Sequence, residues 1–278
     1  MEIRLGLASL QAPTPTFQTL MMALWTARHV PLLACSLLCL LPRSVAVDCP
    51  AGAMATGPDG CSACPAGTYR TGATHYNLAR ACGADGLQPC STQQSSSMSG
   101  ESGESAAVYA VDGNRNTAFG IGSCTHTEWG QGHLSPWWMV DLGQVRAVRA
   151  VKIWNRGDCC SERLQGFDIR VGDAAASYSS ATACFTGGTA PMASPYTVQV
   201  DCEGSGRYLY IGLPGSSEAL ALCEVQVYEG CNTCPELSTS PAGSDAVSDC
   251  TCNAGAPGPD GGPCSQCTAG EYLCLQVL

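Results

Sequence analysis

The uneven distribution of cysteine is the feature of this 278-residue chain that most restricts its fold. Twenty cysteines are present, and glycine, proline and serine accompany them at both ends, whereas aromatic and β-branched residues concentrate in the middle. The ends have too few apolar residues to form cores of their own, so cross-links must replace the missing burial. Because the length is that of one or two domains, we expect one sizeable core with small disulfide-rich modules beside it.

Residues 1–46 are predicted to be a secretory signal rather than part of the fold. The basic pair Arg28-His29 precedes the apolar run Val30–Leu41, and the small residues Ser44–Ala46 are spaced as signal peptidase requires. Met21 or Met22 would be a more ordinary start for such a signal. The run is too short to span a bilayer, so we expect a secreted product with no membrane insertion. Removing the signal takes two of the twenty cysteines and leaves eighteen, which should oxidise.

The charge of the chain excludes some classes of partner. Its net charge is -10, and Lys152 is its only lysine. A protein that neutralises phosphates needs a basic stripe, which this sequence lacks. We therefore expect no nucleic-acid partner and no electrostatic docking to an anionic membrane.

Residues 47–86 and 231–278 repeat a short cysteine-rich unit. Cys61–Cys64 precedes Pro-Ala-Gly-Thr-Tyr, and Cys264–Cys267 precedes Thr-Ala-Gly-Glu-Tyr. This spacing resembles ephrin-receptor-like and EGF-like repeats, which implies stapled spacers, and the last repeat looks truncated at residue 278. The alternative is zinc, which Cys-x-x-Cys pairs bind well, but secreted thiols oxidise.

Residues 87–230 show the alternation expected of β-strands. Phe167, Ile169 and Val171 alternate with polar residues, as do the apolar residues of 223–227, and Val145–Ile153 is rich in β-branched side chains. No long segment has a helical period. Short runs separated by Gly, Pro, Asn and Asp predict an all-β sandwich.

The segment Arg156–Arg163 reads RGDCCSER and is the strongest candidate for a binding site. If Cys159 and Cys160 bond to each other, they form a flat, apolar sulfur surface between two arginines. A guanidinium has five donors in a planar fork, which suits two neighbouring hydroxyl oxygens. A sugar that carries both a vicinal diol and a methyl group would fit such a surface.

Each component of this segment also has a simpler interpretation. Arginine and aspartate on a loop usually form a solvated ion-pair cluster, and adjacent cysteines usually bond to two distant partners. Arg156–Asp158 also spells an integrin-type tripeptide, although its position inside a disulfide-bearing motif argues against that role.

The middle of the chain resembles the F-type lectin (fucolectin) family. The resemblance covers about half of the chain and rests on AVDGNRNTAF from Ala110, GSCTHT from Gly122, PWWMVDL from Pro136, NRGDCCSERL from Asn155, GRYLYIGLP from Gly206 and LCEVQV from Leu222. It implies an eight-stranded jelly-roll β-sandwich of the galactose-binding, discoidin-like type. It also implies that loops at one end of the sandwich bind L-fucose.

The resemblance assigns the sugar site to seven side chains: Phe119, His126, Arg156, Asp158, Cys159, Cys160 and Arg163. Both arginines would hold a vicinal diol, neutral His126 would donate to another sugar oxygen, and Asp158 would orient an arginine. The disulfide and Phe119 would pack against the methyl of a 6-deoxy sugar, worth about 0.8 kcal/mol. The interval from His126 to Arg156 is longer than is usual in the family, and the extra residues fall in the polar loop Glu128–Ser135.

The resemblance also implies a structural Ca²⁺ ion. Calcium takes six to eight oxygen ligands and accepts backbone carbonyls. The implied ligands are the carbonyls of Tyr109, Asn114 and Cys223 and the side chains of Asp112, Ser123 and Glu224. The alternative is an Asp-Gly-Asn tight turn that holds no ion.

The disulfides implied by the resemblance are Cys159–Cys160, Cys124–Cys223 and Cys184–Cys202. No familiar catalytic motif occurs, and a secreted vicinal cysteine pair is a poor nucleophile, so we predict that the chain is not an enzyme. The carboxylates of Asp158 and Glu162 could suggest a glycoside hydrolase, but the sugar-binding motif explains them better.

The sequence therefore predicts a secreted, calcium-dependent lectin for terminal L-fucose on glycoproteins or cell surfaces. One such site should bind in the micromolar to millimolar range, so tight capture would need several sites, as in a homo-oligomer. Two alternatives stay open. One is an extracellular protein-interaction domain of discoidin-like fold that binds no sugar, and the other is the targeting module of a larger, truncated protein.

Overall fold

The computed structural model describes residues 49–57, 60–72, 77–84, 86–98 and 105–267. The chain divides into two units, Met1–Val45 and Ala46–Leu278, and every described residue belongs to the second. The predicted signal segment therefore lies outside the described residues. Within the described ranges, no helix is long and apolar enough to cross a membrane.

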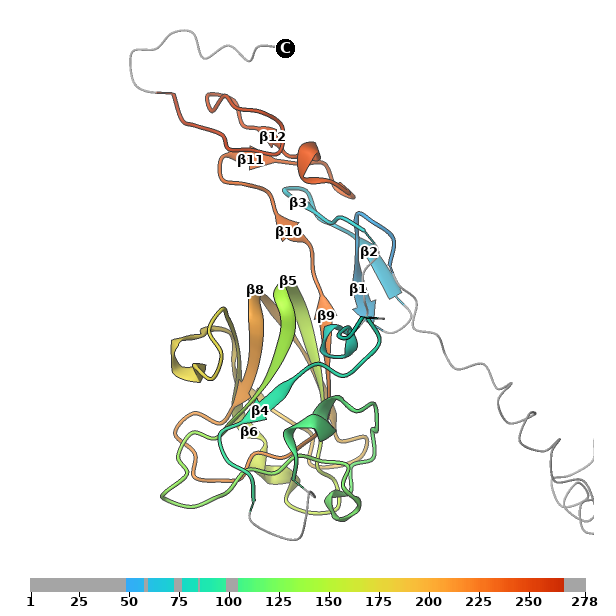
Figure 1. Ribbon diagram of the computed structural model, residues 1–278, viewed down its shortest axis with the longest axis vertical. Helices are drawn as coiled ribbons and strands as arrows, with labels where there is room; N and C mark the ends of the chain where they lie inside the picture. Colours follow the sequence, from blue (N-terminus) through green and yellow to red (C-terminus); the bar gives the residue numbers. More distant parts are fainter. Residues whose placement is uncertain (1–48, 58–59, 73–76, 85, 99–104, 268–278) are drawn as a thin grey trace, which may run out of the picture. The chain divides into compact units, whose positions relative to one another are not determined.

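The described chain consists of β-strands and short 3-10 helices (Figure 1). The strands are β1 (Ala53–Gly57), β2 (Gly60–Ala63), β3 (Thr68–Tyr69), β4 (Thr92–Gln94), β5 (Trp137–Asn155), β6 (Gln165–Gly172), β7 (Thr182–Thr189), β8 (Thr197–Gly212), β9 (Leu222–Glu229), β10 (Asn232–Thr233), β11 (Ser238–Thr239) and β12 (Thr251–Cys252). The 3-10 helices are η2 (Leu78–Arg80), η3 (Ala107–Val111), η4 (Phe119–Ile121), η5 (Ser161–Arg163), η6 (Tyr178–Ser180) and η7 (Val247–Asp249). No α-helix occurs in these ranges.

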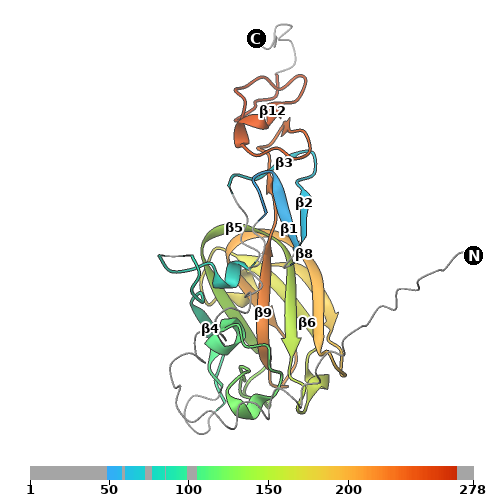
Figure 2. The ribbon, with the colours of Figure 1, turned by 90° about the vertical axis from the view of Figure 1, so that its right-hand side faces the viewer.

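Two long antiparallel strands, β5 and β8, build the sandwich (Figures 1 and 2). Their pairing shifts register between Asp141 and Arg146, and their neighbours differ on the two sides of that shift. Before it, β5 pairs with β4, and the matching end of β8 pairs with β6, which in turn pairs with β7. After it, β5 pairs with β9. Counting β5 and β8 once in each layer, together with β4, β6, β7 and β9, gives eight strand segments.

The core lies between these two layers and confirms the predicted all-β sandwich. Phe167, Ile169 and Val171 of β6 are all buried in it, as their alternation predicted. Every residue of β9 is buried, and β9 contacts η2 and η3 as well as β5. Leu78 and Ala79 of η2 and Ala110 and Val111 of η3 belong to the same core as the valines of β9. Val145 is 59% exposed because it lies at the register shift of β5 rather than inside a paired segment.

The cysteine-rich segments before and after the sandwich are joined to each other. Cys64 forms a disulfide with Cys231, and β3 pairs with β10. The buried Arg70 lies 2.6 Å from Glu229, the last residue of β9. Shorter loops are closed by Cys49–Cys61, Cys82–Cys90, Cys234–Cys250 and Cys252–Cys264.

Trp138, the second of the paired tryptophans, is central to the packing. Its side chain is fully buried, and its indole N–H donates to the carbonyl of Ala107, at 2.8 Å. This bond ties β5 to η3, the helix that precedes the predicted calcium loop. Loss of this hydrogen bond costs free energy, so another large apolar residue cannot replace the tryptophan without loss.

We expect Trp138→Phe to lower the free energy of unfolding by about 1–3 kcal/mol, because the indole hydrogen bond to the Ala107 carbonyl is lost and the smaller ring leaves part of the buried space unfilled. Denaturant unfolding measures the change. The matched control is Trp137→Phe, since Trp137 is adjacent and only partly buried. Equal losses in the two variants would contradict the role given to the indole bond.

Candidate functional site

The loops that carry the predicted sugar site meet at one end of the sandwich, which lies at the bottom of Figure 1. Strand β5 ends at Asn155, whose side chain accepts from the Arg156 N–H at 2.8 Å and donates to the Ser161 carbonyl at 2.8 Å. The Asn155 amide thus closes the loop Arg156–Arg163 on itself. Gly157 lies so close to Tyr196 and Thr117 that a Cβ atom would be 2.7–2.8 Å from their side chains, which requires glycine there.

Asp158 holds Arg156 in a two-pronged ion pair. Arg156 donates from Nε to Oδ1 at 2.8 Å and from Nη2 to Oδ2 at 3.1 Å. Oδ1 also accepts from the Phe119 N–H at 3.2 Å. The hydrogen bond from Arg156 lowers the pKa of Asp158 below its ordinary value, against the opposing effect of partial burial. Asp158 is therefore an ionised anchor that fixes the direction of the guanidinium.

Phe119 is buried and contacts two other predicted site residues. The Arg156 guanidinium lies over its ring at 4.6 Å, and the ring centroid of His126 is 5.1 Å away. A cation over an aromatic face is attracted by the ring quadrupole. Phe119 therefore contacts both Arg156 and His126.

Cys159 and Cys160 form a disulfide with each other. Cys160 adopts a left-handed backbone conformation, with φ of 58°, and η5 begins directly after it. The Arg163 N–H donates to the Cys160 carbonyl at 3.1 Å. Cys159 is exposed and Cys160 is half-buried, so the sulfur pair offers an apolar surface on the loop that carries both arginines. The structure also contains Cys124–Cys223 and Cys184–Cys202, the other two pairs that the resemblance implies.

Arg163 has a partner that the sequence did not indicate. Its Nε lies 3.3 Å from Oε2 of Glu218, a residue of the loop between β8 and β9. Glu218 is more than half exposed, so this ion pair is screened by solvent. The two residues are far apart in the sequence, and no motif marks Glu218.

His126 is almost completely buried, with 2% of its surface exposed. Its Nδ1 lies 2.8 Å from the Thr127 carbonyl, which can only accept, so we assign the proton of the neutral ring to Nδ1. Nε2 of the neutral ring is then an acceptor rather than the donor expected from the sequence. Burial lowers the pKa of His126 below 6.5, and the charges of Arg156 and Arg163 lower it further.

The predicted calcium ligands contain an unpaired buried oxygen. Glu224 is 1% exposed; its Oε2 accepts from the Gly113 N–H at 3.1 Å, but Oε1 has no hydrogen-bond partner. Burial, together with the nearby Asp112 carboxylate, raises the pKa of Glu224 to about 8. Burial also raises the pKa of Asp112. Two carboxylates held close together in a buried site favour either a proton or a cation between them.

The other predicted ligands are close to Asp112 or Glu224 in the sequence, except for Ser123. Tyr109 belongs to η3 and Asn114 follows Asp112, while Cys223 precedes Glu224. The Ser123 hydroxyl donates to the Ala118 carbonyl at 2.6 Å. No group of three His, Cys, Asp or Glu side chains in the described ranges is arranged to hold a metal, so any ion here would depend on carbonyl and hydroxyl ligands.

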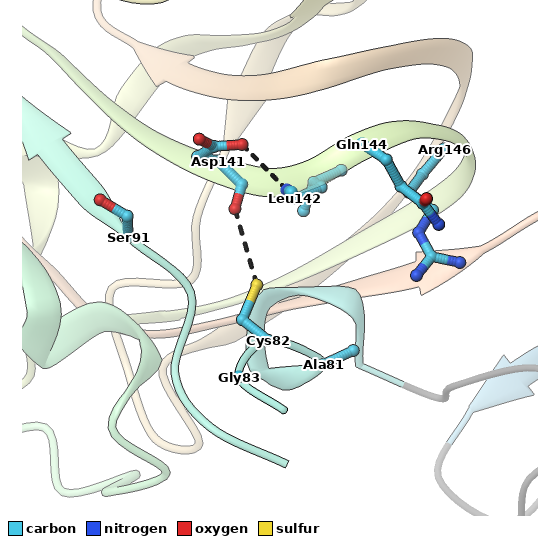
Figure 3. A pocket seen from close by; sticks show the side chains of 9 residues that line it. Ala81, Cys82, Gly83, Ser91, Asp141, Leu142, Gln144 and Arg146 are labelled. Atoms are coloured by element: carbon cyan, nitrogen blue, oxygen red, sulfur yellow. Dashed lines mark hydrogen bonds between the residues drawn. The ribbon is translucent and has the colours of Figure 1, made fainter. Parts of the chain in front are cut away.

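Two cavities of the described structure lie away from these loops. One, of about 490 Å³, is lined by Cys82, Asp141, Gln144 and Arg146, among others (Figure 3). Another, of about 520 Å³, is lined by residues that include Tyr69, Arg149 and Glu203. Neither contains a predicted site residue.

Comparison with known proteins identifies the domain. The family described as "NedA-like, galactose-binding domain" matches residues 109–211. The sandwich and its end loops thus define a galactose-binding-like domain. Fucolectin from Anguilla anguilla is 42% identical over 136 residues, which cover 48% of this chain and 84% of the relative. Fucolectin-4 from Anguilla japonica is 40% identical over 136 residues, 48% of this chain and 73% of the relative. The chain belongs to the fucolectin, or F-type lectin, family.

A solved structure of similar sequence is the serum fucolectin of striped bass, Morone saxatilis. It is 34% identical, with a TM-score of 0.47, and the match covers 56% of this chain and 49% of that chain.

The lowered pKa of His126 predicts how stability depends on pH. Above pH 6.5 the imidazole is neutral in both the folded and the unfolded protein. Below pH 6.5 the unfolded chain takes up a proton first, so the free energy of unfolding falls as pH drops through the folded pKa. Unfolding in denaturant between pH 7.5 and 5 should show this decline in wild type and in His133→Gln, and a weaker decline in His126→Gln. Identical pH profiles for the two variants would contradict it.

Proposed function

We propose that this protein is a secreted lectin that binds terminal L-fucose on glycans, with a structural calcium ion beside the sugar site. One observation carries the proposal. In this member of the fucolectin family, Asp158 holds Arg156 in an ion pair, and the Cys159–Cys160 disulfide follows directly in the sequence. The relatives named above are fucolectins.

The donors that Arg156 retains support recognition of a diol. A guanidinium has five N–H groups, and the ion pair with Asp158 uses one on Nε and one on Nη2. The remaining donors lie on a fork whose direction is fixed before the ligand arrives. Pre-orientation lowers the entropy cost of binding, which matters for a small ligand that makes few contacts.

The other contacts would select the sugar. A hydroxyl that points to His126 could donate to the bare Nε2, while Arg163 could donate to a neighbouring oxygen and give up part of its pairing with the exposed Glu218. The sulfur surface of Cys159–Cys160 would cover the methyl group of a 6-deoxy sugar, and burial of one methyl is worth about 0.8 kcal/mol. The sum is modest, so firm attachment would require several sites together.

We expect Arg156→Gln to abolish measurable binding of methyl α-L-fucoside, because the main donor fork is lost. The matched control is Arg207→Gln, since Arg207 makes the same two-pronged pair with Asp141, at 2.8 and 2.9 Å, outside the candidate site. Isothermal titration calorimetry compares the variants in calcium-containing buffer, and a glycan array tests the preference for terminal fucose. Wild-type protein that binds no fucosylated glycan would refute the proposed function.

The oxygen-lined site between Asp112 and Glu224 fits Ca²⁺ in its donor chemistry. The unpaired Oε1 of Glu224 is a buried acceptor without a donor, and hard carboxylate and carbonyl oxygens are the ligands that calcium prefers. When bound, the ion would neutralise the two carboxylates and hold the loop that follows η3 against β9. The proposed role is therefore structural.

Calcium should raise the melting temperature of wild type relative to protein in EDTA. At a hundred times its Kd, a ligand stabilises the folded state by about 2.7 kcal/mol, which corresponds to roughly 5–10 °C for a domain of this size. Glu224→Gln should lose this shift, whereas Glu203→Gln, at an exposed acid, should keep it. Equal melting temperatures of wild type in calcium and in EDTA would exclude the ion.

A further inference from the structure

An exposed tryptophan borders the proposed fucose site. Trp129 is 54% exposed, and its ring centroid lies 5.9 Å from that of His126, with the two rings almost perpendicular. It belongs to the polar loop Glu128–Ser135, in which Leu134 is also exposed, at 57%. An exposed indole next to a polar site is a surface suited to a ligand that is flat and partly apolar.

The loop that carries Trp129 is held in place. The Gly130 N–H donates to the Ser217 carbonyl at 2.8 Å, and the Ser135 N–H donates to the Ser216 carbonyl at 2.8 Å. The Glu128 N–H donates to the Ser96 hydroxyl at 3.0 Å. Bonds at the start, middle and end of the loop therefore fix the position of the indole.

The segment to which this loop is bonded also reaches the fucose site. Ser216 and Ser217 directly precede Glu218, which pairs with Arg163. Trp129 is thus linked to the site in two ways. Its ring contacts His126, and its loop is hydrogen-bonded to the segment whose Glu218 pairs with Arg163. Because His126 is nearly buried, Trp129 supplies the larger exposed surface on this side of the site.

We propose that the exposed face of Trp129 is a second subsite, which stacks against the pyranose ring to which the terminal fucose is attached. This inference rests on the proposed fucose site. One face of a pyranose presents C–H groups, which are attracted to the negative face of an indole and bury apolar area against it. The Glu218 carboxylate, at the rim, is an acceptor for a hydroxyl of the same ring. The preferred ligand is therefore a fucosylated oligosaccharide rather than free fucose.

Two other exposed apolar residues are less suited to stacking against a sugar ring. Ile121 and Met192 are exposed to a similar degree, at 64% and 63%, but they offer aliphatic side chains without a flat face. Leu134 is exposed on the same loop as Trp129, so it reports on any general disturbance of that loop. Leu134→Ala is therefore the matched control.

The test compares methyl α-L-fucoside with a neutral disaccharide in which the same fucose is linked to a hexopyranose, by calorimetry in calcium. We expect wild type to bind the disaccharide about tenfold more tightly, which corresponds to about 1.4 kcal/mol. Trp129→Ala should lose this gain while its affinity for the methyl fucoside changes less than about twofold. Trp129→Phe should recover most of the gain, and Leu134→Ala should behave as wild type.

Two outcomes would overturn the subsite. In one, wild type binds both ligands equally; in the other, Trp129→Ala loses affinity for both by the same factor, which would make Trp129 a support of His126 only. Both leave the fucose site intact. If wild type binds neither ligand, the proposed function itself fails, and the subsite fails with it. Thermal melting of each variant shows whether the fold is retained.

Discussion

The bonds that join residues 124–127 to residues 220–223, at the start of β9, connect the two proposed sites. We call this pairing the seam: Cys124 forms a disulfide with Cys223, and Thr125 and Leu222 exchange hydrogen bonds, as do Thr127 and Leu220. His126 lies within the seam on the side of the sugar loops. Glu224, one residue after Cys223, faces the loop after η3. The imidazole of His126 and the unpaired carboxylate of Glu224 are thus positioned by the same set of bonds. A change near one of these side chains should therefore alter the position of the other.

A second connection runs from the predicted calcium loop to the arginine motif through Trp154. Arg115, in that loop, lies over the Trp154 ring at 4.9 Å, and Lys152 lies over it at 5.0 Å. Trp154 also packs with Phe119 and the Cys124–Cys223 disulfide. Arg156 follows Trp154 by two residues, and its guanidinium lies over Phe119. The predicted calcium loop, the end of β5 and the Arg156 guanidinium are therefore packed together through Trp154 and Phe119. Such pre-organisation lets a site with few contacts avoid the cost of ordering its side chains.

The sequence predicted the strands and the motif well but not the long-range partners. The alternation in β6 and the spacing of RGDCCSER are local, so they can be read directly. Glu218 pairs with Arg163 only because two loops meet at one end of the sandwich, and no local pattern marks it. The donor expected at His126 is an acceptor in the neutral ring, because the ring N–H, on Nδ1, donates to the carbonyl of the next residue. That geometry depends on the backbone and not on residue type.

The position of the sandwich between Cys64 and Cys231 has a consequence for how the sugar site is presented. Connectivity among many cysteines cannot be deduced from spacing, but this bond shows that the whole lectin domain lies inside one disulfide loop. The buried pair of Arg70 with Glu229, and the contact of Glu229 with Arg146, add ionic links at the same junction. Removing one member would leave a buried charge without a partner, which is strongly destabilising. The two cysteine-rich segments are therefore attached to each other and to β9, so they meet the lectin domain at one junction rather than as two independent hinges.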